Sequence, residues 1–277
     1  MEMTAASAQE RTNPLVTVSI VSHNQGALTS VLLQDLKRIS HTTSLEVILT
    51  LNTDEAPPDL EVDVKFPVQV IYNPEPLGFG ANHNQAFVQA KGDFYCVMNP
   101  DVRLEQDPFT ALLLVFNDPT VALAAPLVKD NAGRIEDSAR QFPSPAKIMC
   151  RAVGRCKNSD YDLSSPTTYP DWVGGMFMLF PSTVFKEFKG FDERFFLYYE
   201  DVDLCARLKL RDKKIVLCST VSVTHQAQRN SHRHFTYFRW HVASMVRFFS
   251  STVYRQMRRN LRTAVPTQPS HNSKLTR

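Results

Sequence analysis

The sequence predicts an α/β fold built on a mostly parallel central sheet with helices on both faces. Three observations carry this prediction. Strand-like and helix-like segments alternate along the first half of the chain, which is typical of parallel sheets. Polar residues stand where several of the predicted strands end. With 277 residues and 43% hydrophobic content, the chain can bury the core of one large domain or of two closely fused ones.

The first strand is predicted at 16–20, where Val16, Val18 and Ile20 alternate with small or polar residues. Between residues 28 and 39 apolar side chains recur at helical spacing behind Asn24 and Gly26, which predicts a helix. The same patterns predict further strands at 45–51, 68–72, 94–98, 121–125, 176–180 and 215–223, and helices at 81–90, 109–116 and from 200 onward.

The polar residues at the strand ends form a pattern of their own. Since the carboxyl ends of parallel strands meet at one edge of a sheet, these residues are expected to converge on one crevice. They are Ser22, His23 and Asn24 after the first strand, then Asn52, Asn73, and Asn99-Pro100-Asp101. Neither Gly-x-Gly-x-x-Gly after the first strand nor a P-loop occurs, which disfavours dinucleotide oxidoreductases and P-loop enzymes.

The segment 189–204 crowds five carboxylates and five aromatic residues together. Aromatic faces pack on sugar rings and a carboxylate can deprotonate a hydroxyl, so the segment favours a sugar site. The alternative is that Glu200, Asp201 and Asp203 are favourable charges on the first turn of a helix.

Cysteine usage and apolar runs bear on localisation. The five cysteines are odd in number and include no Cys-x-x-Cys pair, so neither a disulfide framework nor a zinc ribbon is indicated, and a reducing cytosol fits best. The first thirty residues lack the apolar core of a signal peptide, and the longest aliphatic run is too short to span a bilayer. We therefore expect a cytoplasmic protein.

Charge divides the chain in two. Residues 1–212 carry 19 basic and 28 acidic side chains, whereas 12 basic residues and no acidic ones follow Asp212. Within this basic part, apolar residues recur at helical spacing at 235, 238, 242, 245, 249 and 253. Such a helix can lie on the inner face of an anionic membrane. Alternatively, the stripe packs against the protein body or in a homodimer; without a reader motif, nucleic-acid binding is disfavoured.

Several motifs occur in a fixed order: Val18-Ser-Ile-Val-Ser-His-Asn24, Leu77-Gly-Phe-Gly-Ala-Asn-His-Asn84, Asn99-Pro-Asp-Val102, Trp172-Val-Gly-Gly175, Gly190-Phe-Asp-Glu193 and Tyr199-Glu-Asp-Val-Asp-Leu204. In this order, from about residue 16 to 225, the chain resembles a family 2 glycosyltransferase of the rhamnosyltransferase type. The resemblance implies a GT-A fold and inverting transfer from a nucleotide sugar. It implies a nucleotide-sugar-binding half (15–125) and an acceptor-binding and catalytic half (126–226). We expect a flexible N-terminus (1–14) before them, and charge, apolar spacing and composition predict a basic helical tail (227–263) and a disordered end (264–277) after them.

The resemblance also implies residue roles. Asp201 would be the general base, with Glu200 as the alternative. Asp101 and His225 would hold Mg²⁺ or Mn²⁺, with Asn99 assisting. The donor would contact Ser22, His23, Asn24, Asn52, Gly78, Asn84 and Asn99, and the acceptor would contact Trp172, Gly174, Gly175 and Asp192.

Simpler interpretations stay open for several of these residues. Asn99-Pro100-Asp101 could only form a turn, Trp172 could be a core residue, Asp192 could cap a turn, and His225 could be a solvated loop histidine. Asp203 is expected to cap the helix or to hold an arginine such as Arg207.

One departure from the family concerns the nucleobase. Family members usually end the second strand with Asp-Asn, the acid reading the base, whereas this chain has Leu51-Asn52.

The function expected is transfer of L-rhamnose from dTDP-rhamnose to a surface polysaccharide or lipid-linked glycan. The alternatives are a UDP-hexose donor, or a non-catalytic carbohydrate-binding or scaffold subunit. A nucleotidyltransferase would need a glycine-rich, basic loop, and residues 22–28 contain no basic residue.

Overall fold

The computed structural model describes residues 14–58, 64–155, 159–226 and 235–263. The predicted disordered end at 264–277 and all but residue 14 of the predicted flexible N-terminus lie outside these ranges.

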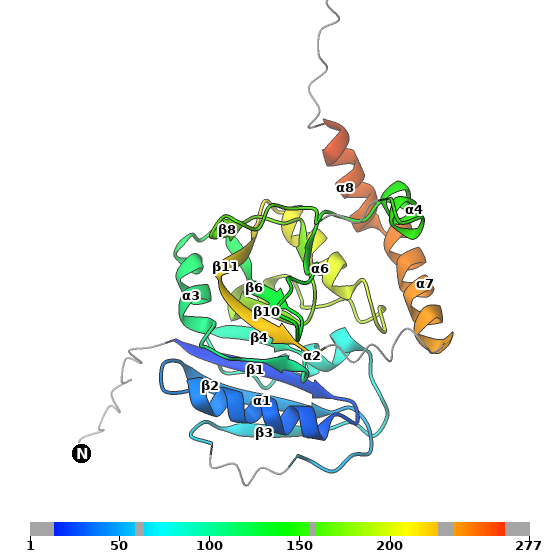
Figure 1. Ribbon diagram of the computed structural model, residues 1–277. Helices are drawn as coiled ribbons and strands as arrows, with labels where there is room; N and C mark the ends of the chain where they lie inside the picture. The colour runs from blue at the N-terminus through cyan, green and yellow to red at the C-terminus, as the bar shows by residue number, and fades with distance from the viewer. Residues whose placement is uncertain (1–13, 59–63, 156–158, 227–234, 264–277) are drawn as a thin grey trace, which may run out of the picture.

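One large sheet organises the protein, with strand order β3-β2-β1-β4-β10-β6-β11-β5 (Figure 1). The first four strands in this order are mutually parallel: β3 (Val68–Tyr72), β2 (Ser44–Leu51), β1 (Leu15–Ser22) and β4 (Phe94–Met98). Strand β10 (Phe177–Pro181) runs antiparallel between β4 and β6 (Val121–Lys129), and β11 (Lys214–His225) is parallel to β6. Two short strands, β5 (Val102–Arg103) and β8 (Thr167–Thr168), pair with β11 in this sheet, whereas β7 (Ala139–Arg140) and β9 (Trp172–Val173) form a separate two-stranded sheet.

Helices cover both faces of this sheet. One face packs against α1 (Gly26–Ile39) and α3 (Phe109–Leu114), which continues into a 3₁₀ turn at Val115–Asn117. The other packs against α2 (Phe79–Phe87), α5 (Ser182–Glu187) and α6 (Glu200–Lys209). Strand β4 serves both faces, because successive strand residues point to opposite sides: Cys96 and Met98 join the first cluster, Tyr95 and Val97 the second.

The predicted alternation of strands and helices is confirmed, and so is a mostly parallel sheet. The sequence did not reveal that β10 runs antiparallel, because its pattern is the same for either direction. The predicted division into halves at 125/126 falls inside β6, so the two halves share one continuous sheet. That division stays a prediction.

The basic tail forms two helices, α7 (Phe235–Ser250) and α8 (Thr252–Thr263). Phe248 and Met257 are buried in a third cluster with Tyr199 and Val202 of the α6 region. The predicted apolar stripe is therefore divided between two environments. Its members Met245, Phe249 and Val253 pack on this cluster, whereas Phe235 and Phe238 are exposed.

In the described ranges, no helix combines the length and the apolar character needed to cross a bilayer.

Ser144 caps α4 (Pro145–Ala152) by accepting a hydrogen bond from the Lys147 amide. Cys96, Cys205 and Cys218 are buried free thiols, but Cys150 in α4 is disulfide-bonded, which the sequence analysis did not anticipate. Among the described cysteines one is disulfide-bonded and three are free, which differs from the several bridges of a disulfide framework.

Candidate active site

Three chain segments meet at the same edge of the sheet. Met98 pairs with Ile20 of the parallel strand β1 and with Phe177 of the antiparallel strand β10. The end of β1, the end of β4 and the start of β10 therefore lie together. The Asn99 amide donates to the Met176 carbonyl at 3.0 Å, which joins the last two segments. The convergence expected from the strand ends is present in the fold.

Asp101, His225 and Glu136 form a chain of charged contacts at this edge. The His225 ring lies between the carboxylates, with Nδ1 3.0 Å from Glu136 Oε2 and Nε2 3.3 Å from Asp101 Oδ1. Burial lowers the pKa of His225, but the two neighbouring carboxylates of Asp101 and Glu136 outweigh burial, so the net pKa is raised. His225 is thus not a solvated loop histidine.

This arrangement fits a divalent cation. Asp101 Oδ1 is buried and has no hydrogen bond within the described part of the chain, so an acceptor oxygen stands ready beside the His225 nitrogen. Metal-binding histidines typically donate their other ring nitrogen to a carboxylate, and Glu136 lies at that position. Among the described residues no group of three or more ligand side chains converges. The protein would supply two ligands and leave the others to phosphate and water, as is usual for Mg²⁺.

The Glu200-Asp201 pair begins helix α6. Oδ1 of Asp201 accepts from the Val202 amide at 2.8 Å, and Oδ2 accepts from the Gly175 amide at 3.1 Å. Burial raises the pKa of Asp201 to about 6, although these backbone hydrogen bonds oppose the rise. Its side chain keeps partial contact with solvent. Asp201 is therefore ionised at neutral pH, and its pKa of about 6 is close enough to neutral pH for it to act as a proton acceptor.

Glu200 has a different environment from its neighbour. It is only 5% exposed, and its Oε2 has no hydrogen-bond partner among the described residues. Burial, and then the charge of Asp201, raise the pKa of Glu200 well above its usual value. A protonated, enclosed carboxyl is poorly suited to accept a proton from an incoming substrate. Of the two, Asp201 has the properties of a general base.

The turn that precedes α6 has an unusual backbone. Tyr198 and Tyr199 have φ angles of 70° and 69°, a left-handed conformation that costs roughly 1–2 kcal/mol per non-glycine residue. Helix α7 holds this turn: Ser244 Oγ donates to the Leu197 carbonyl at 2.8 Å, and the Tyr199 ring lies 5.6 Å from that of Phe248. The C-terminal helices thus stabilise the segment that leads into Asp201.

Where β1 ends, a carboxylate from the loop after β2 closes the β1–α1 turn. Glu55 accepts from Ser22 Oγ at 2.8 Å, from the Asn24 amide at 3.0 Å and from Thr53 Oγ1 at 3.1 Å. Asn24 is itself left-handed, with φ of 57°. The sequence analysis did not identify Glu55. His23 is exposed on the same turn.

Asn52 lies deeper than its predicted donor role requires. It is 5% exposed, and its side chain donates to the Leu77 carbonyl and accepts from the Leu77 amide. Asn73 bridges Asn52 to Asn82, whose amide donates to the Gly78 carbonyl. These three asparagines hold the loop at 77–78 in place. For Asn52, the geometry favours positioning of that loop over direct reading of a nucleobase.

Gly78 and Asn84 join this loop region to the segment 191–196, which precedes α6. A Cβ on Gly78 would lie 2.7 Å from the Phe196 carbonyl oxygen, so only glycine allows this close approach. The Asn84 amide donates to the Phe191 carbonyl at 2.9 Å, and its oxygen accepts from the Phe191 amide at 2.9 Å. Both residues fasten α2 to the segment that carries Asp201.

Trp172 belongs to β9, which packs against α6, the helix that begins at Glu200-Asp201. Its ring lies 5.7 Å from the Arg140 guanidinium, and its indole nitrogen donates to the Gln141 carbonyl at 3.1 Å. The ring also packs against two of the core clusters, so much of it serves as structure. The positive charge of Arg140 opposes the rise that burial causes in the pKa of Asp201, and so favours its ionised form.

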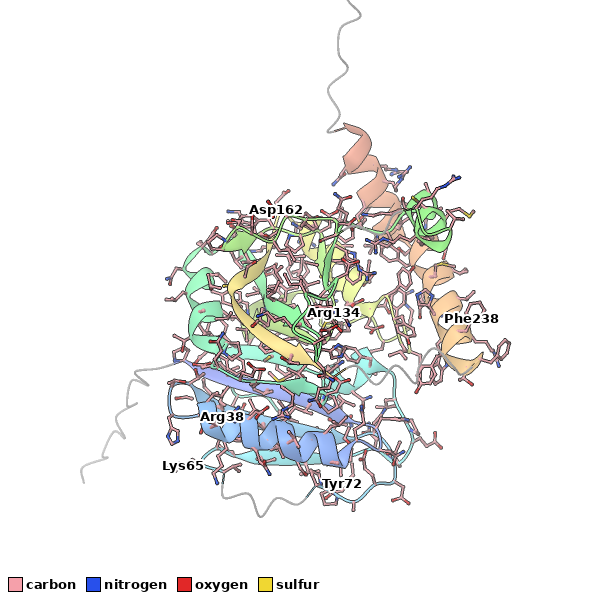
Figure 2. The ribbon with its side chains drawn as sticks, viewed as in Figure 1. Arg38, Lys65, Tyr72, Arg134, Asp162 and Phe238 are labelled. Atoms are coloured by element: carbon pink, nitrogen blue, oxygen red, sulfur yellow. The ribbon has the colours of Figure 1, made fainter. Side chains whose placement is uncertain are left out.

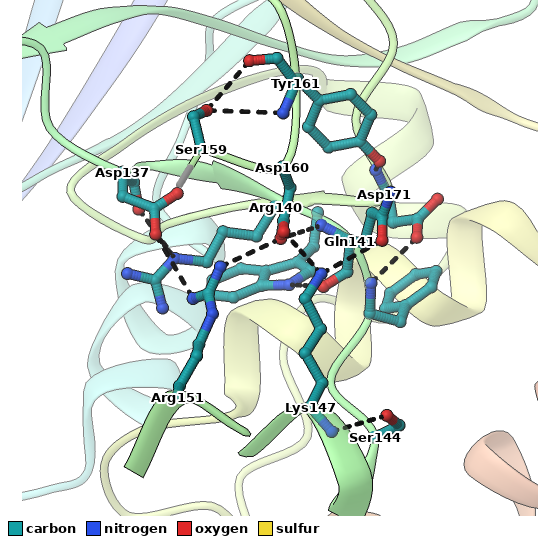
Figure 3. A network of polar contacts seen from close by, with 12 residues as sticks. Asp137, Arg140, Gln141, Ser144, Lys147, Arg151, Ser159, Asp160, Tyr161 and Asp171 are labelled. Atoms are coloured by element: carbon teal, nitrogen blue, oxygen red, sulfur yellow. Dashed lines mark hydrogen bonds and ion pairs between the residues drawn. The ribbon is translucent and has the colours of Figure 1, made fainter. Parts of the chain in front are cut away.

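A network of ion pairs connects Arg140 with helix α4. Asp160 pairs with Lys147 at 2.6 Å and with Arg151 at 3.2 Å, and Asp137 pairs with Arg140 at 3.0 Å (Figure 3). The network fastens α4 to the loop that carries Asp160 and, through the 3.3 Å pair of Arg151 with Asp137, to the start of β7. Gly174 adds a further link, since its amide donates to the Ser138 carbonyl at 2.8 Å.

Two acidic residues near α6 have structural partners. Asp192 forms a two-pronged contact with the Arg194 guanidinium and accepts from the Arg194 amide at 3.1 Å, the geometry of a turn cap. The expected pair of Asp203 with Arg207 is confirmed, with Nε 2.8 Å from Oδ2. Arg207 also donates to the carbonyls of Phe188 and Gly190.

Sequence reasoning missed Glu55, Glu136 and Arg140. Each stands outside the motifs, on a loop or a two-residue strand, and acts on a motif residue that is distant in the sequence. Glu136 and His225, for example, are 89 positions apart. An isolated charged residue in a loop gives no periodic signal that would mark it.

This geometry agrees with comparisons to known proteins. The chain belongs to the glycosyltransferase-like family 2, whose family model matches residues 13–243. It is thus a glycosyltransferase enzyme of the rhamnosyltransferase-like type, as the sequence motifs indicated.

Two curated relatives are rhamnosyltransferases. Rhamnosyltransferase WbbL of Escherichia coli K12 is 28% identical over 186 residues, which cover 62% of this chain and 70% of the relative. An N-acetylglucosaminyl-diphospho-decaprenol L-rhamnosyltransferase of Mycobacterium tuberculosis is 29% identical over 178 residues, 57% of this chain and 58% of the relative. The chain thus spans little more than half the length of the mycobacterial protein.

Solved structures support the GT-A fold. The mannosyltransferase PcManGT of Pyrobaculum calidifontis, solved with GDP-Man and Mn²⁺, superposes with a TM-score of 0.59 at 14% identity. The match covers 93% of this chain and 66% of that one. At this identity the likeness establishes the fold only.

Proposed function

We propose that the protein transfers L-rhamnose from dTDP-rhamnose to a lipid-linked glycan or a growing surface polysaccharide, with inversion at the anomeric carbon. The observation that carries this proposal is the placement of the Asp201 carboxylate, held by the Gly175 amide, at the same sheet edge as the Asp101–His225 pair. The rhamnosyl donor and the lipid-linked acceptor are supported by the two rhamnosyltransferase relatives.

In the proposed reaction Asp201 takes the proton of an acceptor hydroxyl as its oxygen attacks the anomeric carbon. The bond from that carbon to the diphosphate breaks on the opposite face, and dTDP leaves with the electron pair. One ionised carboxylate is sufficient for this displacement. Asp101 and His225 would hold Mg²⁺ or Mn²⁺, which would neutralise the charge that grows on the diphosphate. Mn²⁺ in the mannosyltransferase structure supports this role.

Thermal unfolding with a panel of nucleotide sugars tests the donor. At a concentration of 100 times the Kd, a ligand stabilises the native state by about 2.7 kcal/mol, which corresponds to an increase in Tm of roughly 5–10 °C. We expect dTDP-rhamnose with Mg²⁺ to give this increase. A larger increase with a UDP-hexose would favour that donor instead. No increase with any donor would favour a non-catalytic carbohydrate-binding or scaffold subunit.

Removing the Asp101 carboxylate should make dTDP binding insensitive to divalent ions. In Asp101→Ala the cation would lose its oxygen ligand, so Mg²⁺ should no longer strengthen dTDP affinity. Calorimetric titration of dTDP with and without Mg²⁺ measures this difference, and Asp162→Ala on the exposed surface is the control. If Mg²⁺ strengthened binding equally in all three proteins, Asp101 would not be a metal ligand.

The rate of transfer should rise with pH through a midpoint near 6. Asp201 must be ionised to accept a proton, and burial raises its pKa to about 6, so the base is protonated and inactive below that pH. Measuring kcat between about pH 5 and 8 tests this expectation. A kcat that stayed constant across this range would argue against Asp201 as the base.

A further inference from the structure

Helix α7 presents an apolar outer face to solvent. Residues spaced three and four apart share one side of a helix, and on this side Phe235 is 74% exposed, Phe238 65% and Val246 58%. Phe238 points away from the protein body (Figure 2). Val242 continues the same row, and Arg239 is exposed beside it. A run of large apolar side chains on one helix face is uncommon on a soluble surface and marks an interaction site.

Arginines flank this face and extend onto α8. Helices α7 and α8 contain arginines at 239, 247, 255, 258, 259 and 262 and no acidic residue. A hollow of about 270 Å³ at their junction is lined by Phe249, Tyr254, Arg255, Arg258 and Arg259. Phe249 follows Val242 and Val246 in the helical repeat and also packs on Tyr199, so the hollow adjoins the apolar row where α7 meets the protein body. Together they form one surface, here named the α7–α8 surface.

We propose that the α7–α8 surface docks on an anionic lipid bilayer. Apolar side chains with arginines beside them suit the boundary between acyl chains and headgroups, and an arginine-lined hollow suits a lipid phosphate. The charge argues against a second copy, because a symmetric contact would place Arg239 and Arg247 against their own counterparts. A nucleic acid would engage the arginines but would leave the aliphatic side chains of Val242 and Val246 without a partner.

The opposite face of α7 connects this surface to the active site. Ser244 on that inner face donates to the Leu197 carbonyl, in the turn that leads into Asp201. A helix with its side chains is about 10 Å in diameter, so a bilayer on the outer face would lie close to that turn. This point rests on the proposed function, because a lipid-linked acceptor has to meet Asp201 at a membrane surface.

Vesicle co-sedimentation of the intact chain tests the proposal. We expect binding to vesicles of mixed phosphatidylglycerol and phosphatidylcholine, weak binding to phosphatidylcholine alone, and weakening as salt rises. The double variant Phe235→Ser, Phe238→Ser should bind about 10-fold more weakly or worse, because it loses apolar area. The variant Arg255→Gln, Arg258→Gln should bind more weakly by about 5-fold for each arginine removed. Leu114→Ser, at a residue that is 64% exposed on α3, is the matched control and should bind normally.

Several outcomes would overturn the proposal. Equal binding to both vesicle types, or normal binding by the phenylalanine variant, would remove the surface from membrane docking. Concentration-dependent dimerisation that is lost in Phe235→Ser, Phe238→Ser would identify a second copy as the partner. If an oligonucleotide displaced the protein from the vesicles and removed the part of the binding that depends on the arginines, the partner would be a nucleic acid. The vesicles contain no sugar donor or acceptor, so vesicle binding does not depend on transfer activity. Binding of dTDP by each variant shows that its active site remains folded.

Discussion

Asp201→Asn is expected to lower the rate of sugar transfer by about 10² to 10⁴, the usual contribution of a general base. The amide keeps the shape of the side chain and can still accept hydrogen bonds from the Val202 and Gly175 amides. It cannot take the proton of the acceptor hydroxyl. Donor affinity should therefore remain close to that of the original protein. Steady-state kinetics of transfer, together with calorimetric titration of dTDP, separates the two effects.

Glu200→Gln is the matched control for this experiment. Glu200 is buried and its raised pKa keeps it protonated, so a neutral amide resembles its native state. We expect a much smaller loss of transfer in Glu200→Gln than in Asp201→Asn. Near-normal turnover in Asp201→Asn, with a large loss in Glu200→Gln, would reverse the two roles.

Phe248→Ala is expected to damage both stability and turnover. Phe248 is fully buried beneath Tyr199, so its truncation should lower the free energy of unfolding by about 3–5 kcal/mol. The left-handed turn at 198–199 would lose its packing partner and could relax, which would move Asp201. Since a displacement of about 1 Å can reduce catalysis 100-fold, we expect turnover per folded molecule to decline by roughly 10- to 100-fold.

Two further variants separate positioning from general destabilisation. Leu36→Ala truncates a fully buried residue of α1 and should cost about 2–5 kcal/mol without affecting turnover per folded molecule. Ser244→Ala removes only the hydrogen bond to Leu197, about 1 kcal/mol, so it should fold and yet show reduced kcat with unchanged dTDP affinity. Normal kcat in Ser244→Ala and in the folded fraction of Phe248→Ala would contradict a positioning role for α7.

Local pattern was sufficient to predict most of the sheet. Apolar residues alternate in β1 and recur at helical spacing in α1, which identified a strand and a helix, although β1 is buried on both faces. The meeting of Asn99, Asp101 and Ser22 at one edge followed from the parallel arrangement alone. Asp101 and His225, predicted together as metal ligands, lie 3.3 Å apart.

Pairings between distant segments could not be predicted in this way. Glu136 contacts His225, and the charge of Arg140 acts on Asp201, although each pair is far apart in the sequence. Asn52 illustrates the opposite case. Its position after β2 suggested a donor contact, but Leu77 occupies both ends of its amide. A strand end locates a residue at the crevice without deciding what its side chain contacts.

The most direct test of the proposed function is the stereochemistry of the product. Transfer from dTDP-L-rhamnose to a polyprenyl-diphosphate-linked N-acetylglucosamine, with Mg²⁺ present, can be followed by nuclear magnetic resonance of the anomeric centre. We predict a glycosidic bond of the opposite anomeric configuration to the donor, formed by the original protein and nearly absent with Asp201→Asn. A product that retains the donor configuration, or equal product from both proteins, would contradict inverting transfer by Asp201.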